Sequence, residues 1–136
     1  MKKYSRQREA LLTQIRSRKD HPTAEDLYLS LRAEMPNYSL GTVYRNLSEL
    51  CSNGYVMKLA SFTGPERYDG CTLPHGHFTC VKCGKIYDID GVYEKYIDKD
   101  AIMKELSNHS DNNAIKTASE IRLMIYGICS GCDSEE

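Results

Sequence analysis

The sequence predicts an α+β fold in two parts, a helical N-terminal part and a smaller α/β part that carries a structural zinc site. Three observations predict this fold. Apolar residues recur at helical spacing in three segments before residue 54. Residues 55–69 then alternate loosely in polarity around a Thr-Gly-Pro turn, which is typical of a two-stranded hairpin. Two Cys-x-x-C pairs follow among strand-like segments.

The first two predicted helices cover residues 5–19 and 21–35. Each begins at a side chain that can cap free backbone N–H groups, Ser5 in the first and Thr23 in the second. Asp26 stands three residues after Thr23, where it can complete a capping box. The apolar stripes consist of Leu11, Leu12 and Ile15 in the first helix and of Leu27, Leu31 and Met35 in the second.

The third predicted helix is capped by Ser39 and ends before Gly54, a residue suited to the left-handed position that follows a helix. Its polar side chains Thr42, Tyr44 and Arg45 lie off the apolar stripe, where they can contact another molecule. The stripe itself consists of Leu40, Val43, Leu47, Leu50 and Cys51.

Three short helices followed by a hairpin form the pattern of a winged helix-turn-helix. In such folds the last helix enters the major groove of DNA, and the hairpin lies against the DNA backbone. The pattern also fits a small helical domain with a surface hairpin. Residues 1–68 carry 11 Lys and Arg against 7 Asp and Glu, and residues 69–136 carry 7 against 12. This asymmetry indicates two parts with different partners, although it does not by itself indicate nucleic acid.

Turn-forming residues at 69–74 mark the predicted hinge between the two parts. Beyond the hinge, residues 77–89 predict a strand, a tight turn and a second strand. Residues 98–108 predict a helix. Residues 114–132 are predicted to end in a long β-rich run with the second Cys-x-x-C turn. The second part is therefore expected to mix helices and strands.

The 136-residue chain has no stretch that approaches the roughly 20 apolar residues needed to span a bilayer. Its first residues also lack the apolar core of a signal peptide. We therefore expect a soluble, cytoplasmic protein without a membrane partner. Six cysteines in such a chain favour metal binding over a disulfide framework.

The two Cys-x-x-C pairs are Cys80 with Cys83 and Cys129 with Cys132. Each pair places two thiolates on one turn, and together they can supply the four corners of a tetrahedral zinc site. Such a site is closed and therefore structural. It would fasten the end of the chain to the start of the β-rich part. A redox pair or unbound thiols are the alternatives, and two pairs at matching spacing favour zinc.

His75 and His77 form an H-x-H motif directly before the first cysteine pair, with Asp69 upstream and Asp88 downstream. Alternate residues of an extended strand point to the same side, so both imidazoles can serve one metal. A nitrogen and oxygen donor set suits iron or manganese better than a thiolate site does. The alternatives are a surface strand without a metal, or one metal shared by two histidines and two cysteines.

Taken together, these segments resemble the ferric uptake regulator (Fur) family of bacterial metal-dependent transcription factors, and most closely its PerR-like peroxide sensors. The resemblance extends over nearly the whole chain. It implies a homodimer with a winged-helix DNA-binding domain at 1–70 and a dimerisation and metal-binding domain at 71–136. It also implies a repressor, not an enzyme, that binds an AT-rich palindromic operator in double-stranded DNA. The segments that carry it are "HPTAEDLY", "SLGTVYRNLSEL", "GYV", "ERYD", "HGHFTCVKCGKIYDI" and "IYGICSGC".

The resemblance also implies the functional residues. The regulatory Fe(II) or Mn(II) would be held by His21, Asp69, His75, His77 and Asp88, and the structural zinc by Cys80, Cys83, Cys129 and Cys132. The DNA-reading residues would be Ser39, Thr42, Tyr44 and Arg45. In peroxide sensors, Fe(II)-catalysed oxidation adds oxygen to ligand histidines, here expected at His21 and His75.

Asp88 favours a peroxide sensor over an iron- or manganese-level sensor, because plain iron sensors of the family more often have Glu there. Cys71 keeps a zinc sensor under consideration, because such sites usually include a thiolate. Glu120 and Ile121 replace a histidine that relatives often carry, so a further metal site in the second part is not expected. His109 is given no role. The short N-terminus implies fewer DNA contacts than in relatives.

Two other function classes fit the sequence less well. A zinc deaminase needs a glutamate beside its ligand histidine, and "HGHF" has none. A zinc-stabilised interaction module that binds no DNA leaves the polar face of "TVYRNL" without a purpose.

Overall fold

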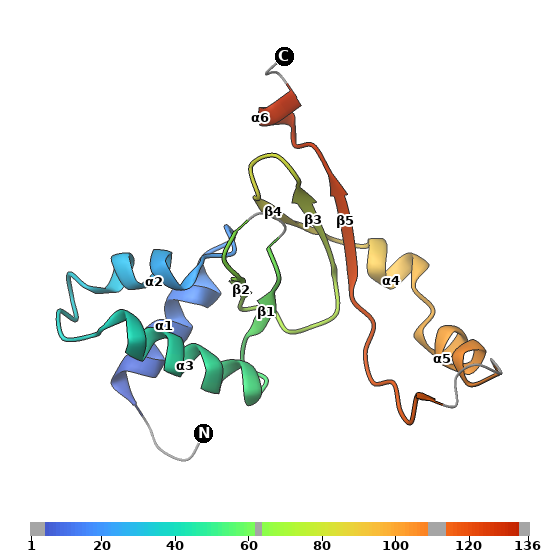
Figure 1. Ribbon diagram of the computed structural model, residues 1–136, viewed down its shortest axis with the longest axis horizontal. Coiled ribbons are helices and arrows are strands. Elements are labelled where there is room, and N and C mark those ends of the chain that lie inside the picture. The colour runs from blue at the N-terminus through green and yellow to red at the C-terminus, as the bar shows by residue number, and fades with distance from the viewer. Residues whose placement is uncertain (1–4, 62–63, 109–113, 134–136) are drawn as a thin grey trace.

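The computed structural model describes residues 5–61, 64–108 and 114–133. Its N-terminal part is a bundle of three helices followed by a two-stranded hairpin (Figure 1). Strands β1 and β2 pair antiparallel, with Met57 opposite Asp69. The helices are α1 (Arg6–Ser17), α2 (Ala24–Leu31) and α3 (Leu40–Ser52), and the strands are β1 (Met57–Leu59) and β2 (Arg67–Asp69). This is the predicted order of elements.

The helix caps form as the sequence predicts. The hydroxyl of Ser5 accepts from the backbone N–H of Arg8, and that of Ser39 accepts from the N–H of Thr42. Thr23 and Asp26 form the reciprocal capping box. These contacts satisfy N–H groups that have no partner within the helix.

The helix boundaries are narrower than predicted. The second helix starts at Ala24, directly after its predicted cap Thr23, but it ends at Leu31, where a turn begins, and not at residue 35. The third helix ends as expected, since Gly54 has φ +78°, a left-handed conformation that favours glycine.

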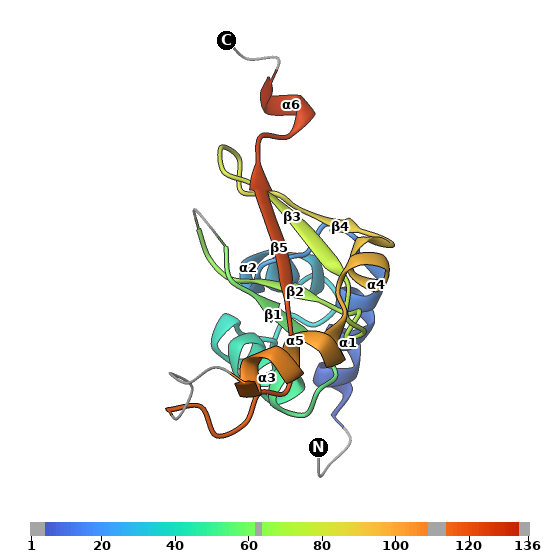
Figure 2. The ribbon, with the colours of Figure 1, turned by 90° about the vertical axis from the view of Figure 1, so that its right-hand side faces the viewer.

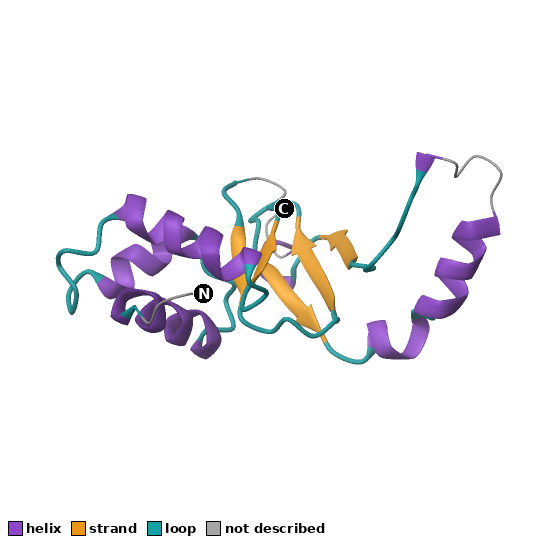
Figure 3. Ribbon diagram, turned by 90° about the horizontal axis from the view of Figure 1, so that it is seen from below, coloured by secondary structure: helices purple, strands orange, loops and turns teal. Residues whose placement is uncertain are grey.

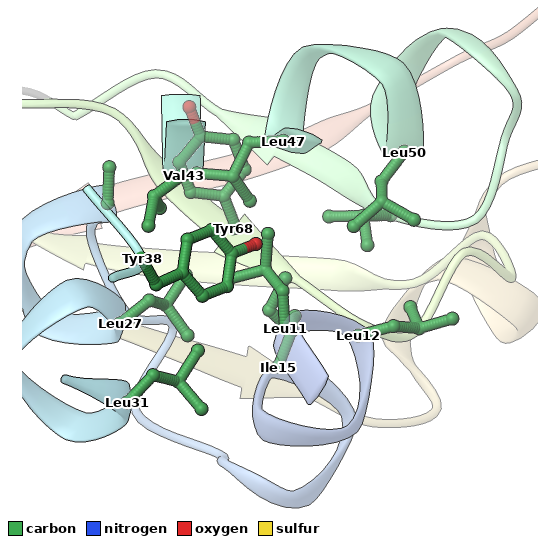
Figure 4. Packing of buried hydrophobic residues seen from close by; sticks show 12 residues of the cluster. Leu11, Leu12, Ile15, Leu27, Leu31, Tyr38, Val43, Leu47, Leu50 and Tyr68 are labelled. Carbon is green, nitrogen blue, oxygen red and sulfur yellow. The ribbon is translucent and has the colours of Figure 1, made fainter. Parts of the chain in front are cut away.

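The hydrophobic core of the N-terminal part joins all three helices and the hairpin (Figure 4). Tyr38 and Tyr68 lie among its leucines, and the hydroxyl of Tyr38 accepts a hydrogen bond of 2.8 Å from the buried amide of Asn46. The other labelled core residues are Leu11, Leu12, Ile15, Leu27, Leu31, Val43, Leu47 and Leu50. The apolar stripes predicted from sequence therefore do meet in one core.

The second part is built on a three-stranded sheet with strand order β4–β3–β5. β3 pairs antiparallel with β4 and parallel with β5, which runs along it in Figure 2. The elements are β3 (Gly76–Cys80), β4 (Ile86–Ile89), α4 (Val92–Tyr96), α5 (Lys99–Asn108), β5 (Leu123–Gly127) and α6 (Ser130–Asp133).

The β-rich run predicted at the end of residues 114–132 forms the strand Leu123–Gly127, and the second Cys-x-x-C continues into the short helix α6. Parallel pairing with β3 stabilises only the five residues that find partners there. The sequence also gave no indication of α4, which is five residues long.

The strands lie between the N-terminal helices and α4 and α5 (Figure 3). Close packing at the hinge leaves no room at Gly70, where a Cβ atom would lie 2.9 Å from the Cα of Arg16. The guanidinium of Arg122 donates to the backbone oxygen of Lys58 in β1 at 3.1 Å. None of the helices in residues 5–61, 64–108 and 114–133 has the length and apolar content needed to span a bilayer.

Candidate metal centres

Four cysteines gather where β3, the turn after it and the end of the chain meet. The sulfur atoms of Cys80, Cys83, Cys129 and Cys132 all lie within 4.8 Å of one another. Cys83 Sγ lies 3.8 Å from Cys129 Sγ, whereas a disulfide bond would be about 2.05 Å long. Zinc–sulfur bonds of about 2.3 Å at tetrahedral angles separate the sulfurs by about 3.8 Å. The cluster therefore fits a structural zinc site.

Backbone N–H groups point at the sulfur of Cys80. Those of Cys83 and Cys129 lie 3.5 Å and 3.4 Å from it. These contacts lower the pKa of the Cys80 thiol to about 6. The thiolate is the form that binds metal, so the fold favours the ligand state of this buried cysteine.

A second cluster combines three histidines and two aspartates from both parts of the chain. His21 lies just before α2, and Asp69 ends β2. His75 directly precedes β3, and His77 lies in β3, where it pairs in register with Asp88 of β4. Of these residues, His21, Asp69, His77 and Asp88 have donor atoms within 4.8 Å of one another.

The three Nε2 atoms surround one oxygen of each carboxylate. Asp69 Oδ2 lies 2.9 Å from His77, 3.0 Å from His75 and 3.4 Å from His21. Asp88 Oδ1 lies 2.9 Å from His21, 3.0 Å from His75 and 3.3 Å from His77. Divalent ions that bind donors at about 2.1 Å and at right angles hold neighbouring donor atoms about 3.0 Å apart. The spacing of this cluster fits such an ion.

The tautomer of His75 also fits a metal ligand. Its Nδ1 lies 2.7 Å from the backbone oxygen of Leu73, and a carbonyl can only accept, so Nδ1 carries the proton. In a neutral imidazole, Nε2 then carries a lone pair directed at two carboxylates. A cation between these groups removes the repulsion between the lone pair and the carboxylates. A ligand histidine usually donates its other ring N–H to a carbonyl, as Nδ1 of His75 does here.

Electrostatics at the cluster favours charged carboxylates. Burial alone would raise the pKa of Asp69, but hydrogen bonds from His21, His77 and the Cys71 N–H lower it well below its usual range. Burial would lower the pKa of His21, yet contacts with Asp69 and Asp88 raise it. In the metal-free protein, a proton on His21 therefore balances the charge of Asp69, and a metal would have to replace that proton.

The side chains of the cluster differ in their exposure to solvent. The side chains of His21 and His77 are 2% and 4% exposed, whereas that of Asp88 is 34% exposed. A small molecule can therefore approach the donors beside Asp88, while His21 stays deep in the protein.

The ferric uptake regulator family model matches residues 2–119 of this chain. The chain belongs to the ferric uptake regulator family. Among its relatives is the peroxide operon regulator of Bacillus subtilis, with 35% identity over 130 residues, which are 96% of this chain and 83% of that protein. The peroxide-responsive repressor PerR of Staphylococcus epidermidis is 33% identical over 95% of this chain and 80% of its own length.

Solved structures of the Fur family have the same fold. The Helicobacter pylori ferric uptake regulator superposes with a TM-score of 0.71 at 23% identity, over 98% of this chain and 84% of that one. The Campylobacter jejuni peroxide stress regulator gives a TM-score of 0.68 at 29% identity, over 93% of this chain and 88% of that one. The predicted fold class is thereby confirmed.

The DNA-reading residues predicted from the Fur resemblance lie along the start of α3. Tyr44 and Arg45 are exposed, and Tyr44 retains 50% of its accessible surface. Ser39 and Thr42 share a hydrogen bond of 2.8 Å, and the Arg45 guanidinium donates to the Thr42 hydroxyl at 3.2 Å. These four side chains form a polar surface available to a ligand.

The remaining candidates of the sequence lie outside both clusters. Cys71 is exposed and contributes only its backbone N–H, to Asp69 Oδ1 at 2.8 Å. Cys51 packs partly buried against the core, as a thiol on an apolar stripe should. Thr63 of the predicted turn and His109 lie outside the described residues. Sequence reasoning missed Arg67, whose guanidinium contacts the backbone of His21, although it stands within the quoted "ERYD".

Proposed function

We propose that this chain is a metal-dependent DNA-binding repressor that senses peroxide through Fe(II)-catalysed oxidation of its ligand histidines. The convergence of five donor side chains from both parts of the chain is the observation that carries this proposal. Peroxide-responsive relatives at 33–35% identity support the peroxide assignment.

The four-cysteine cluster is assigned to structural zinc. Cys80, Cys83, Cys129 and Cys132 would hold it, and four thiolates leave no position open for a substrate. The zinc would fasten the end of β5 to the turn after β3. This assignment also argues against a zinc enzyme.

The regulatory metal is assigned to His21, Asp69, His75, His77 and Asp88. Fe(II), when bound, would catalyse the two-electron reduction of hydrogen peroxide by a neighbouring imidazole. In the net change, one peroxide replaces the C–H at ring carbon 2 of a histidine by C=O and leaves as water, so the ring loses two electrons. By the family resemblance, His21 and His75 are the expected targets.

Oxidation of His21 would release the winged-helix part. His21, between α1 and α2, and Asp69, at the end of the hairpin, are the two donors from domain 1–70, and the other three belong to domain 71–136. A 2-oxo-imidazole is a poorer ligand, so only Asp69, next to the hinge, would still connect the helical domain to the metal, and the angle between the two domains would no longer be fixed. Metal binding would select the arrangement that fits two half-sites.

A homodimer on an AT-rich palindromic operator is part of the proposal. β5 exposes 40% of Ile125 and 57% of Tyr126, and no residue of α5 is buried. Exposed apolar side chains on neighbouring elements favour a protein interface. Ser39, Thr42, Tyr44 and Arg45 would contact the DNA of each half-site, and a cytoplasmic location follows from this function.

The alternative is a Fur-type sensor of iron or manganese levels that does not respond to peroxide. Both functions predict that metal promotes DNA binding, so peroxide chemistry must separate them. The test compares Fe(II)- and Mn(II)-loaded protein after brief exposure to hydrogen peroxide, by tryptic mass mapping and by gel shift on an AT-rich palindrome.

The peroxide sensor should gain 16 Da at His21 or His75, the mass of one oxygen atom, and lose DNA binding in the iron sample alone. Mn(II)-loaded protein is the control and should keep both its mass and its DNA. If neither histidine gains oxygen in the iron sample while DNA binding persists, the level sensor is the better account. If no metal promotes DNA binding, both functions fail.

A further inference from the structure

The backbone of His21 is held in a strained conformation. Within residues 5–61, 64–108 and 114–133, His21 is the only residue other than glycine with a positive φ, at +52°. L-amino acids with a side chain seldom adopt this left-handed region, and such strain persists only where surrounding contacts impose it. The question is therefore which contacts hold His21 there.

The Nδ1 atom of His21 does not orient the imidazole through a hydrogen bond in the described part of the chain. This nitrogen is buried and has no hydrogen-bond partner among the described residues. His75, in contrast, places its Nδ1 2.7 Å from the Leu73 oxygen. Ligand histidines are normally oriented through that nitrogen. Apart from the contacts of Nε2 with Asp69 and Asp88, the direction of the His21 ring must therefore be set through its backbone.

Strand β2 supplies the contacts that set this backbone. The Nη1 group of Arg67 donates to the carbonyl oxygen of His21 at 3.1 Å. The next residue, Tyr68, donates its backbone N–H to Pro22 at 3.0 Å, and Thr23 forms a single β-bridge with Arg67. The Nε of Arg67 is buried and has no hydrogen-bond partner in the described residues. The hydrogen bond of this side chain to His21 is therefore made by Nη1.

Arg67 and Asp69 act from the same face of β2, because alternate residues of a strand point the same way. Asp69 contributes a donor atom to the histidine cluster, and Arg67 forms a hydrogen bond with the backbone of His21, the donor that lies between α1 and α2. We propose that Arg67 is a positioning residue that holds His21 in its left-handed conformation and thereby aims the imidazole at the regulatory metal. The proposal rests on the metal site assigned above.

The positioning role makes a quantitative prediction. Removing a group that orients a metal ligand typically weakens metal affinity about 10-fold to 100-fold. Arg67→Met and Arg67→Leu both remove every donor and keep an apolar stem, and either one serves if the other does not fold. Arg67→Lys restores a single donor and should bind Mn(II) more tightly than both. Glu66→Ala is the matched control, since Glu66 is exposed and forms an ion pair with Lys58 at 3.4 Å, away from His21.

Mn(II) affinity is measured by titration of zinc-replete protein, with free Mn(II) followed by electron paramagnetic resonance. Co(II) absorption provides a second readout, since loss of one imidazole changes its d–d bands. A purely structural role would lower the melting temperature and leave the spectrum of bound Co(II) unchanged. The expected result is weaker Mn(II) binding and an altered Co(II) spectrum for Arg67→Met or Arg67→Leu, and parental values for Glu66→Ala.

His21→Ala separates this proposal from the site on which it rests. If His21→Ala binds Mn(II) as the parent does, His21 is not a ligand and the proposed site fails. If His21→Ala loses affinity while a folded Arg67→Met or Arg67→Leu protein keeps it, the site stands and the positioning role of Arg67 is wrong. Equal loss in Arg67→Lys and Arg67→Met would likewise contradict positioning by a hydrogen-bond donor.

Discussion

His21 Nε2 lies 2.9 Å from Asp88 Oδ1, although 67 positions separate the two residues in the chain. One residue precedes α2 and the other lies in β4, so the contact joins the helical part to the sheet. Together with Asp69, it makes the histidine cluster a junction between the two parts. What binds there must affect how they are arranged.

Replacing His21 should separate metal binding from folding. His21→Ala removes one of five donors, and we expect Mn(II) affinity to fall by more than about 100-fold, since outer-shell partners alone are worth about 10-fold to 100-fold. Zinc content should not change, because the cysteine cluster is a separate group. Titration with Mn(II) and elemental analysis measure both. Asp90→Asn, a change at an exposed carboxylate near Asp88, is the control and should bind as the parent.

Replacing one cysteine should remove the zinc and the dimer together. Cys129→Ser leaves three thiolates and frees the end of β5, and structural zinc contributes a binding free energy of about 10–16 kcal/mol to folding. Elemental analysis should show loss of zinc, and sedimentation should show loss of the dimer. Cys71→Ser, at an exposed cysteine outside the cluster, should change neither. A stable dimer of Cys129→Ser without zinc would contradict the structural role.

Replacing Arg45 should weaken DNA binding alone. Arg45 is exposed on α3, where its guanidinium donates a hydrogen bond to the Thr42 hydroxyl. A groove-facing arginine is worth about 1–3 kcal/mol, so Arg45→Ala should bind the operator about 5-fold to 150-fold more weakly. Metal affinity should stay at the parental value. Arg32→Ala, which removes an equal charge from the end of α2, is the control for a general loss of charge. Unchanged binding by Arg45→Ala would mean that α3 is not the reading helix.

Local signals in the sequence predicted the parts of the fold that local contacts determine. Ser5, Thr23 and Ser39 cap their helices as expected, because a cap needs only residues within one turn. The cysteine pairs were equally visible, because a Cys-x-x-C turn fixes two zinc corners by itself. The apolar stripes predicted the core residues, because the spacing of apolar residues along one helix is also a local signal.

Contacts between segments that are far apart in the chain could not be predicted from such local signals. The pairing of β3 with β5 depends on a connection of more than 40 residues, and nothing local in 114–122 shows that the strand starts only at Leu123. The spacing of His75, His77 and Asp88 suggested a metal, but only the family resemblance pointed to His21. Its left-handed backbone and its contact with Arg67 depend on a strand 46 residues away in sequence.

The stabilisation by Mn(II) should increase with pH. Burial opposes charge on His21 and His75, but Asp69 and Asp88 raise the pKa of His21 above the usual value, and the Leu73 oxygen together with these carboxylates raises that of His75. In the metal-free protein their charged forms contribute stability that is fully present below the unfolded pKa of about 6.5 and is lost as pH rises through the folded pKa. The pKa of Asp69 is lowered, so its contribution is present above about pH 4 and is lost only in strong acid.

Metal binding requires neutral imidazoles, so Mn(II) competes with protons at any pH below the raised folded pKa values of His21 and His75, and it replaces the stabilisation by protons above them. The gain in melting temperature on adding Mn(II) should be larger at pH 8 than at pH 6. Scanning calorimetry at both pH values, with and without Mn(II), measures it. His21→Ala should show little gain at either pH. A gain that is equal or larger at pH 6 would contradict the assigned ligands.

Asp88→Glu should slow the reaction with peroxide and leave metal-dependent DNA binding in place. The carboxylate of Asp88 is the most exposed of the cluster, and its Oδ1 lies within 3.3 Å of all three Nε2 atoms. One added methylene keeps a carboxylate donor but displaces it beside His21 and His75, on the side from which peroxide can approach. Oxygen incorporation into the His21 and His75 peptides of Fe(II)-loaded protein, followed over time by mass spectrometry, should be slower in Asp88→Glu. Gel shift with Mn(II) should match the parent, because all five donors remain.

Asp88→Ala is the contrasting variant and should lose both properties, since it leaves four donors. If Asp88→Glu oxidises at the parental rate, the length of this carboxylate does not control peroxide reactivity, and Asp88 no longer favours a peroxide sensor over a sensor of metal levels.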